Sequence, residues 1–130
     1  MAGLNVKLEI VSRGLGGTPS RIRNSVRINT TNPSQNLSRV SATTTGADTI
    51  ILPSANAERF VYIKHLGLNS AGAKNVTDKL KVEYSDNNHI AELRAGEFLF
   101  LPYDTGGSAL LQLEASANTI QAEYAFFTRS

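Results

Sequence analysis

The feature that most constrains the fold is a two-residue alternation of apolar and polar side chains, interrupted by clusters of turn-forming residues. In the first run, residues 4–10, every second residue is Leu, Val or Ile. Further runs rich in β-branched and aromatic residues cover 59–66, 79–84, 97–101, 110–115 and 119–128. A period of two is typical of β-strands, whose successive side chains point to opposite faces. We therefore expect a half-buried strand at 4–10 and a strand in each of the other runs.

Turn-forming residues separate these runs, at 67–73, 85–88, 95–96 and 104–107. Gly, Asn and Asp tolerate the left-handed backbone of tight turns. Weaker strand patterns occupy 22–28, 37–44 and 49–52, and no helical pattern of useful length lies between the runs. The spacing predicts one all-β domain over residues 1–130, an antiparallel, jelly-roll-like β-sandwich of about eight strands with no long helix. We expect Pro102 to end the run at 97–101, and Pro53, Pro102 or a partner to protect a sheet edge.

Composition divides the chain into two parts. All nine aromatic residues lie between Phe60 and Phe127, whereas residues 12–57 have none and few apolar residues. Residues 1–40 carry a net charge of +5 and residues 41–130 a net charge of −3. We expect 12–57 to be a polar, basic segment, made either of surface loops or of an arm that orders on a partner. The alternative is that its scattered Ile, Val and Leu residues complete the same sandwich.

The basic residues of the first part are the candidate interaction residues. Arg21, Arg23 and Arg27 share one parity, so on a strand they would project from one face. Guanidinium groups on one face suit carboxylates of a neighbouring protein, or phosphates. No aromatic residue lies nearby to stack on bases, and the net charge of +2 is small, so we favour a protein partner over nucleic acid. Arg13 and Arg39 complete this candidate set.

Motifs for catalysis or cofactor binding are incomplete. The glycine-rich stretch 14–19 has proline where a dinucleotide loop needs its third glycine, and no helix is expected after it. The stretch 106–110 resembles a nucleophile elbow at only two positions. We interpret both stretches as loops.

The remaining chemically active residues also favour structural roles. His65 and His89 are the only histidines, too few to form a histidine metal site without other ligands. The turn 86–88 lacks the spaced acidic residues of an EF-hand. Glu92 and Glu97 are interpreted as solvated charges at strand ends, and the chain has no cysteine. We therefore expect no enzyme activity, no metal and no cofactor.

Targeting signals are also missing from the sequence. No apolar run approaches the ~20 residues that cross a membrane. The first seven residues lack a basic region followed by an apolar stretch, so we expect neither a signal peptide nor a membrane partner.

One family resemblance rests on a pattern of strands and turns in the second part of the chain. The segments that carry it are 59–67, 82–84, 91–93, 96–102 and 122–127. Together they resemble the small β-sandwich structural proteins of tailed bacteriophage virions, over roughly residues 58–128. The resemblance implies location in a virion, contact with a major capsid or tail protein, and a homo-oligomer on the particle. It carries over no functional residue, because it marks the core of a fold.

The expected function is therefore that of a non-enzymatic virion protein, a capsid decoration or cement subunit that acts through intersubunit contacts. A tail or fibre-adaptor protein is the alternative within the same class. A carbohydrate- or ligand-binding β-sandwich module is the alternative from another class. That module would need an exposed aromatic platform, for which the candidates are Tyr62, Tyr103 and Phe127.

Overall fold

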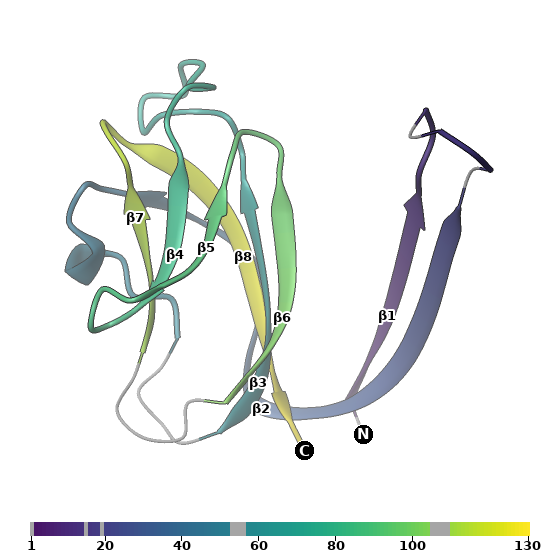
Figure 1. Ribbon diagram of the computed structural model, residues 1–130. Coiled ribbons are helices and arrows are strands. Elements are labelled where there is room, and N and C mark those ends of the chain that lie inside the picture. Colours follow the sequence, from purple (N-terminus) through teal and green to yellow (C-terminus); the bar gives the residue numbers. More distant parts are fainter. Residues whose placement is uncertain (1, 15, 19, 53–56, 105–109) are drawn as a thin grey trace.

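The computed structural model describes residues 2–14, 16–18, 20–52, 57–104 and 110–130, and it is built from eight β-strands (Figure 1). The strands are β1 (Ala2–Val11), β2 (Arg21–Ala42), β3 (Glu58–His65), β4 (Leu80–Tyr84), β5 (His89–Leu93), β6 (Phe98–Asp104), β7 (Leu111–Ala115) and β8 (Ile120–Arg129). The only helix among the described residues is one 3₁₀ turn, η1 (Gly46–Asp48). The prediction of an all-β chain without a long helix is confirmed.

The strands form two antiparallel sheets. One has the order β1-β2-β8-β3-β6 and the other β5-β4-β7. An isolated bridge between Ile50 and Gln112 lies beside β7, in the place of a fourth strand of the smaller sheet. With that bridge counted, β2-β8-β3-β6 faces Ile50-β7-β4-β5, which is the strand order of a jelly roll. The predicted sandwich is therefore present, with one strand reduced to a single bridge.

The core lies between these two sheets. It is formed by alternate residues of the facing strands, among them Val61 and Ile63 of β3 and Leu111 and Leu113 of β7, all with no exposed surface. The face of β8 predicted from its alternation is also turned inward, since Ile120 and Ala122 are fully buried. Alternation thus locates the core residues of this part of the chain correctly.

Strand β2 is 22 residues long and belongs to two different structures. Its second half pairs with β8, whereas its first half pairs only with β1, over ten residue pairs from Ala2–Thr30 to Val11–Arg21. The register with β8 shifts between Thr31 and Gln35 and again between Gln35 and Ser38. Figure 1 shows β1 and the first half of β2, at the edge of the larger sheet, standing away from the other strands of both sheets. We call residues 2–30 the arm and the rest of the chain the body.

The segment 12–57 divides between these two regions. Its weak strand patterns at 22–28 and 37–44 are parts of the one strand β2, and the pattern at 49–52 forms no strand beyond the bridge at Ile50. Ala42, Ile51 and Leu52 are buried in the core, whereas Ile22, Val26 and Leu37 are exposed. The segment 12–57 is therefore neither entirely an arm nor entirely part of the core.

Three further predictions are corrected by the structure. Strand β1 was expected to be half-buried, but Leu8 and Ile10 are 45% and 48% exposed because no second layer covers the arm. Strand β6 does not stop at Pro102 but continues to Asp104. Proline is tolerated there because β6 is an edge strand, so the missing N–H breaks no ladder bond. Strand β5 was not predicted, because its sequence HIAEL has one β-branched residue, no aromatic residue and no strict alternation.

Candidate assembly surface

The arm is an amphipathic two-stranded ribbon. Its cross-strand pairs Leu4–Ile28, Val6–Val26 and Ile10–Ile22 place aliphatic side chains on one face. Val26 and Ile22 are 54% and 49% exposed. Burying one such side chain stabilises a fold by about 1.5–3 kcal/mol, and an isolated two-stranded hairpin is at best marginally stable in water. The apolar face of the arm is therefore largely exposed, without a second layer over it.

The outward face of the larger sheet is aromatic. Alternate residues of β3, β6 and β8 place five of the nine aromatic side chains on it, namely Phe60, Tyr62, Phe98, Phe100 and Phe127. The rings of Phe60 and Phe100 stack with their centroids 5.9 Å apart, and those of Tyr62 and Phe98 are 6.5 Å apart. Phe98 is 62% exposed. We call these five residues the aromatic face.

A cleft of about 930 Å³ separates the aromatic face from the arm. Leu4, Val6, Leu8 and Val26 line it from the arm, and Tyr62, Phe98, Phe100 and Phe127 from the sheet. Two β-layers that pack directly lie ~10 Å apart with interdigitated side chains, and a packed interior leaves few voids larger than water. The arm and the aromatic face therefore point toward each other without packing on each other.

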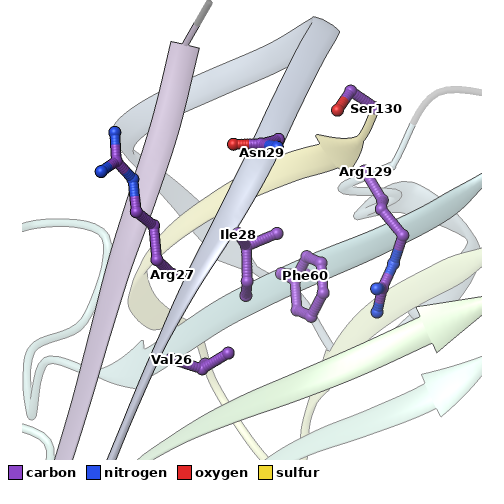
Figure 2. A pocket seen from close by; sticks show the side chains of 7 residues that line it. All are labelled: Val26, Arg27, Ile28, Asn29, Phe60, Arg129 and Ser130. Carbon is purple, nitrogen blue, oxygen red and sulfur yellow. The ribbon is translucent and has the colours of Figure 1, made fainter.

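The two walls of the cleft approach each other at the base of the arm. Figure 2 shows Val26, Ile28, Phe60 and Arg129 around a smaller pocket of about 300 Å³ at this place. Ile28 is buried, and the guanidinium of Arg129 lies 4.8 Å from the ring centre of Phe60. Arg129 Nε also lies 2.9 Å from Glu58 Oε2. At this place the Ser130 amide donates a hydrogen bond to the Asn29 carbonyl oxygen at 3.1 Å and Thr30 pairs with Arg129, so the end of β8 attaches the arm to the body.

The predicted arginine stripe lies on the other face of the arm. Register places Arg21, Arg23 and Arg27 on the face opposite to Val26 and Ile28, as their shared parity predicts. Figure 2 shows Arg27 pointing away from Phe60. Arg21 Nε and Arg23 Nε lie 3.8 and 3.4 Å from the carboxylate of Glu9, which sits on the same face. We call Lys7, Arg21, Arg23 and Arg27 the basic face of the arm.

The other two predicted arginines lie elsewhere. Arg13 is exposed in the loop between β1 and β2, and Arg39 is exposed on the body, opposite Glu123 of β8. The structure thus brings together three of the five candidate residues, and their role in binding stays a prediction.

The histidines have structural surroundings. His65 is fully buried; its Nδ1 accepts a hydrogen bond from the Gly67 amide at 2.9 Å, and its Nε2 lies 3.0 Å from the Asp78 carbonyl oxygen. That pattern makes Nε2 the protonated nitrogen, since a carbonyl can only accept. Among the described residues no group of three or more His, Asp or Glu side chains is arranged to hold a metal ion.

Glu92 and Glu97, which the sequence predicts to be solvated charges at strand ends, are exposed, and each has a hydrogen-bonding partner. Glu92 Oε1 lies 3.0 Å from Lys79 Nζ, and the hydrogen bond from Lys79 lowers the pKa of Glu92. Glu97 Oε2 accepts a hydrogen bond from the Arg94 amide at 2.8 Å. The turn at 86–88 is closed by Asp86 and by Asn87 at φ 66°, as a turn residue requires. Residues 15, 19 and 106–109 of the two glycine-rich stretches lie outside the described part of the chain.

A buried polar cluster in the smaller sheet was not predicted. Glu83 has no exposed surface; its Oε1 accepts a hydrogen bond from Gln112 Nε2 at 2.9 Å, and its Oε2 lies 3.2 Å from His89 Nε2. A hydrogen bond to Glu83 and burial raise the pKa of Glu114. Gly46 packs against this cluster so closely that an added Cβ would lie 2.5 Å from Glu83 Oε1. Alternation places Glu83 on the polar face of its strand together with Lys81, and the structure buries Glu83 while Lys81 stays partly exposed.

The exposed aromatic residues were also only partly predicted. Of the three candidates for an aromatic platform, Tyr62 and Phe127 line the cleft, but Tyr103 is buried against Tyr84, and burial raises the pKa of Tyr103 to about 12. Phe98 and Phe100 were missed. A signal for them exists in the sequence, because 59–66 and 97–101 carry apolar residues at both parities and so have two apolar faces.

Comparisons with protein-family models, with curated proteins and with solved structures find no match to this chain. Within the described residues, none of the helical structure is long and apolar enough to span a membrane.

Proposed function

We propose that this chain is a non-enzymatic structural protein of a virion, and that it serves as a capsid decoration subunit through contacts between subunits. The observation that carries the proposal is the cleft, whose two walls are an amphipathic arm and an aromatic face. Contiguous exposed apolar surfaces are a common mark of assembly sites. An extended arm lets a small domain reach a neighbour and bury a large area.

Two further features support the proposal. The jelly roll is the architecture of many viral capsid domains, although this is an analogy of fold and one that lectins share. Repeated weak contacts in a symmetric particle add up to strong attachment without any reactive side chain.

The proposal is tested by locating the protein on purified particles. Mass spectrometry of density-gradient fractions should find it at a constant ratio to the major capsid protein, and immunogold labelling should place it on the capsid surface. A fixed small number of copies at one tail vertex would instead identify the tail or fibre-adaptor alternative. Absence from particles in every fraction would refute both.

The aromatic residues of the cleft favour one second candidate, a carbohydrate-binding module. Sugar rings stack on exposed aromatic rings, and Tyr62, Phe98 and Phe100 present such rings. Lys64 lies on the same face, opposite Phe98 and Glu123, and Glu123 accepts a hydrogen bond from Tyr62 at 3.2 Å, so hydrogen-bonding groups for sugar hydroxyls lie beside the rings. Binding to a glycan array that is lost in Phe98→Ala would support this module. Tyr103→Ala does not test it, because Tyr103 is buried.

A further inference from the structure

We infer that the cleft receives the arm of a second copy of this chain, so that two copies clasp each other by inserting each arm into the partner's cleft. The inference deepens the proposed function and rests on it, since it names the partner of the same surface. It follows from the chemistry of the two cleft walls, the chemistry of the two arm faces, and the symmetry that relates two copies.

Each copy carries both sides of the contact. The arm has an aliphatic face and a basic face, and the cleft has an aliphatic wall, which is the arm itself, and an aromatic wall. A ribbon that fills the cleft must therefore present one face to aliphatic side chains and the other to aromatic rings. The arm of a second copy meets both requirements.

Symmetry decides which face meets which wall. In each copy the apolar face of the arm points toward its own body. When a twofold axis relates two interlocked copies, the two apolar faces therefore meet at the centre, and each basic face points at the partner's aromatic face. This is an isologous contact, which closes at two copies.

The outer contacts of the clasp are chemically matched. Guanidinium groups stack on aromatic faces more readily than lysine ammonium groups do. Three of the four cations of the basic face are arginines, and Phe98 and Phe100 are exposed at the aromatic wall. Charge agrees with this pairing, because the arm carries a net charge of +4 and the rest of the chain a net charge of −2.

The contact is large enough for a stable dimer. At ~3.3 Å per residue and ~4.8 Å between strands, the ten-pair arm presents faces of about 330 Å² each. Full overlap of the central contact and both outer contacts would bury on the order of 2,000 Å², and half of that still reaches the ~1,000 Å² of a biological interface.

Two valines provide a matched test by sedimentation of the full chain. Val26 on the apolar face of the arm and Val76 on the body are 54% and 53% exposed, and only Val26 lines the cleft. The wild-type chain should sediment at twice the mass of one chain. Val26→Asp should weaken dimerisation at least ~30-fold, as loss of an interface hot spot does, and Val76→Asp should leave it unchanged. A wild-type chain that is monomeric at all concentrations, or equal effects of the two changes, would overturn the inference.

Crosslinking tests the arrangement, because the chain has no cysteine of its own. With a short bismaleimide, Leu8→Cys should give dimers by itself, and a mixture of Arg23→Cys with Phe98→Cys should give mixed dimers. If Leu8→Cys instead reacts with Phe98→Cys of another chain, the apolar face of each arm packs directly on the partner's aromatic face. The proposed arrangement would then be wrong. If only the double variant L8C/F98C reacts, within one chain, the arm closes on its own body and the inference fails.

The outcome is separable from that of the proposed function. A chain that is found on particles but shows no contact between arms keeps its structural role and refutes the clasp. A chain that clasps in solution but is absent from particles keeps the clasp and loses the virion role.

Discussion

The arm and the body are built from the same kind of sequence and differ in what covers it. Both alternate apolar and polar residues with period two, and both form regular antiparallel pairs. In the body, a second sheet buries the inward residues, so that Ile63 and Leu113 have no exposed surface. In the arm, Leu8 and Val26 have the same period and remain about half exposed. Alternation therefore encodes the strand and its apolar face, and the covering layer must come from elsewhere.

The largest effect expected from this comparison concerns leucines. Leu113→Ala removes buried methyl groups between two sheets and should lower the free energy of unfolding by about 2–5 kcal/mol. Leu8→Ala should lower it by less than ~1 kcal/mol in dilute, monomeric protein, because Leu8 is 45% exposed. Urea unfolding of both variants measures the difference. Equal losses would mean that the arm is packed in the monomer.

Glycines give a second contrast. Gly46→Ala would place a methyl group 2.5 Å from Glu83 Oε1 and 2.7 Å from Gln112 Nε2, so the buried cluster must shift. We expect a loss of about 1–3 kcal/mol, the usual effect of overpacking. In the arm, the Cβ of Gly3→Ala would meet nothing closer than 3.7 Å, so this control should retain the wild-type midpoint in urea. A tolerated Gly46→Ala would show that the cluster around Glu83 is loosely packed.

The same contrast explains which parts of the fold could be predicted from sequence. The strands at 59–66, 79–84 and 119–128 and the turn at 85–88 follow from local alternation and turn chemistry, and the structure confirms them. The outward aromatic residues and the buried Glu83 depend on which layer lies above each face. That information is not local, because the residues that cover Glu83 come from η1, β5 and β7.

Only part of the candidate site could be predicted from the sequence. Parity correctly placed Arg21, Arg23 and Arg27 on one face of a strand. It did not show that β1 pairs with that strand and with no other, or that β2 continues from the arm into the body. Those facts turn a polar, basic segment into one wall of a cleft.

Carboxylates should show a smaller effect that depends on pH. A hydrogen bond to Glu83 and burial raise the pKa of Glu114, so ionised Glu114 destabilises the folded state. This penalty is absent below the unfolded pKa and is complete above the raised folded pKa. Glu114→Gln should therefore stabilise the protein increasingly as the pH rises through that window, by up to ~1 kcal/mol, the scale of like-charge pairs in sheets.

The matched change in the arm is Glu9→Gln, which removes an exposed partner of Arg21 and Arg23. Exposed pairs contribute ~0.2–1 kcal/mol at most, so this variant should follow the wild-type stability closely between pH 4 and 8. Thermal unfolding of both variants over that pH range makes the measurement. A benefit of Glu114→Gln that is independent of pH would contradict the assigned cause.

The smallest effect is expected for removal of most of the arm. A chain that lacks residues 1–27 keeps the buried Ile28 and Thr30 and the whole of the β2–β8 pairing. The free energy of unfolding of its body should change by less than ~0.5 kcal/mol, because none of the fifteen buried residues that form the hydrophobic core lies in the deleted part. Dimerisation should be lost completely.

Deletion of residues 13–40 is the informative contrast, since it also removes Val40 and most of the β2–β8 pairing, and that chain should fail to fold. A shorter chain without 1–27 that also unfolds would show that the arm stabilises the body as well as its partner, and the division of the molecule into two regions would then be wrong.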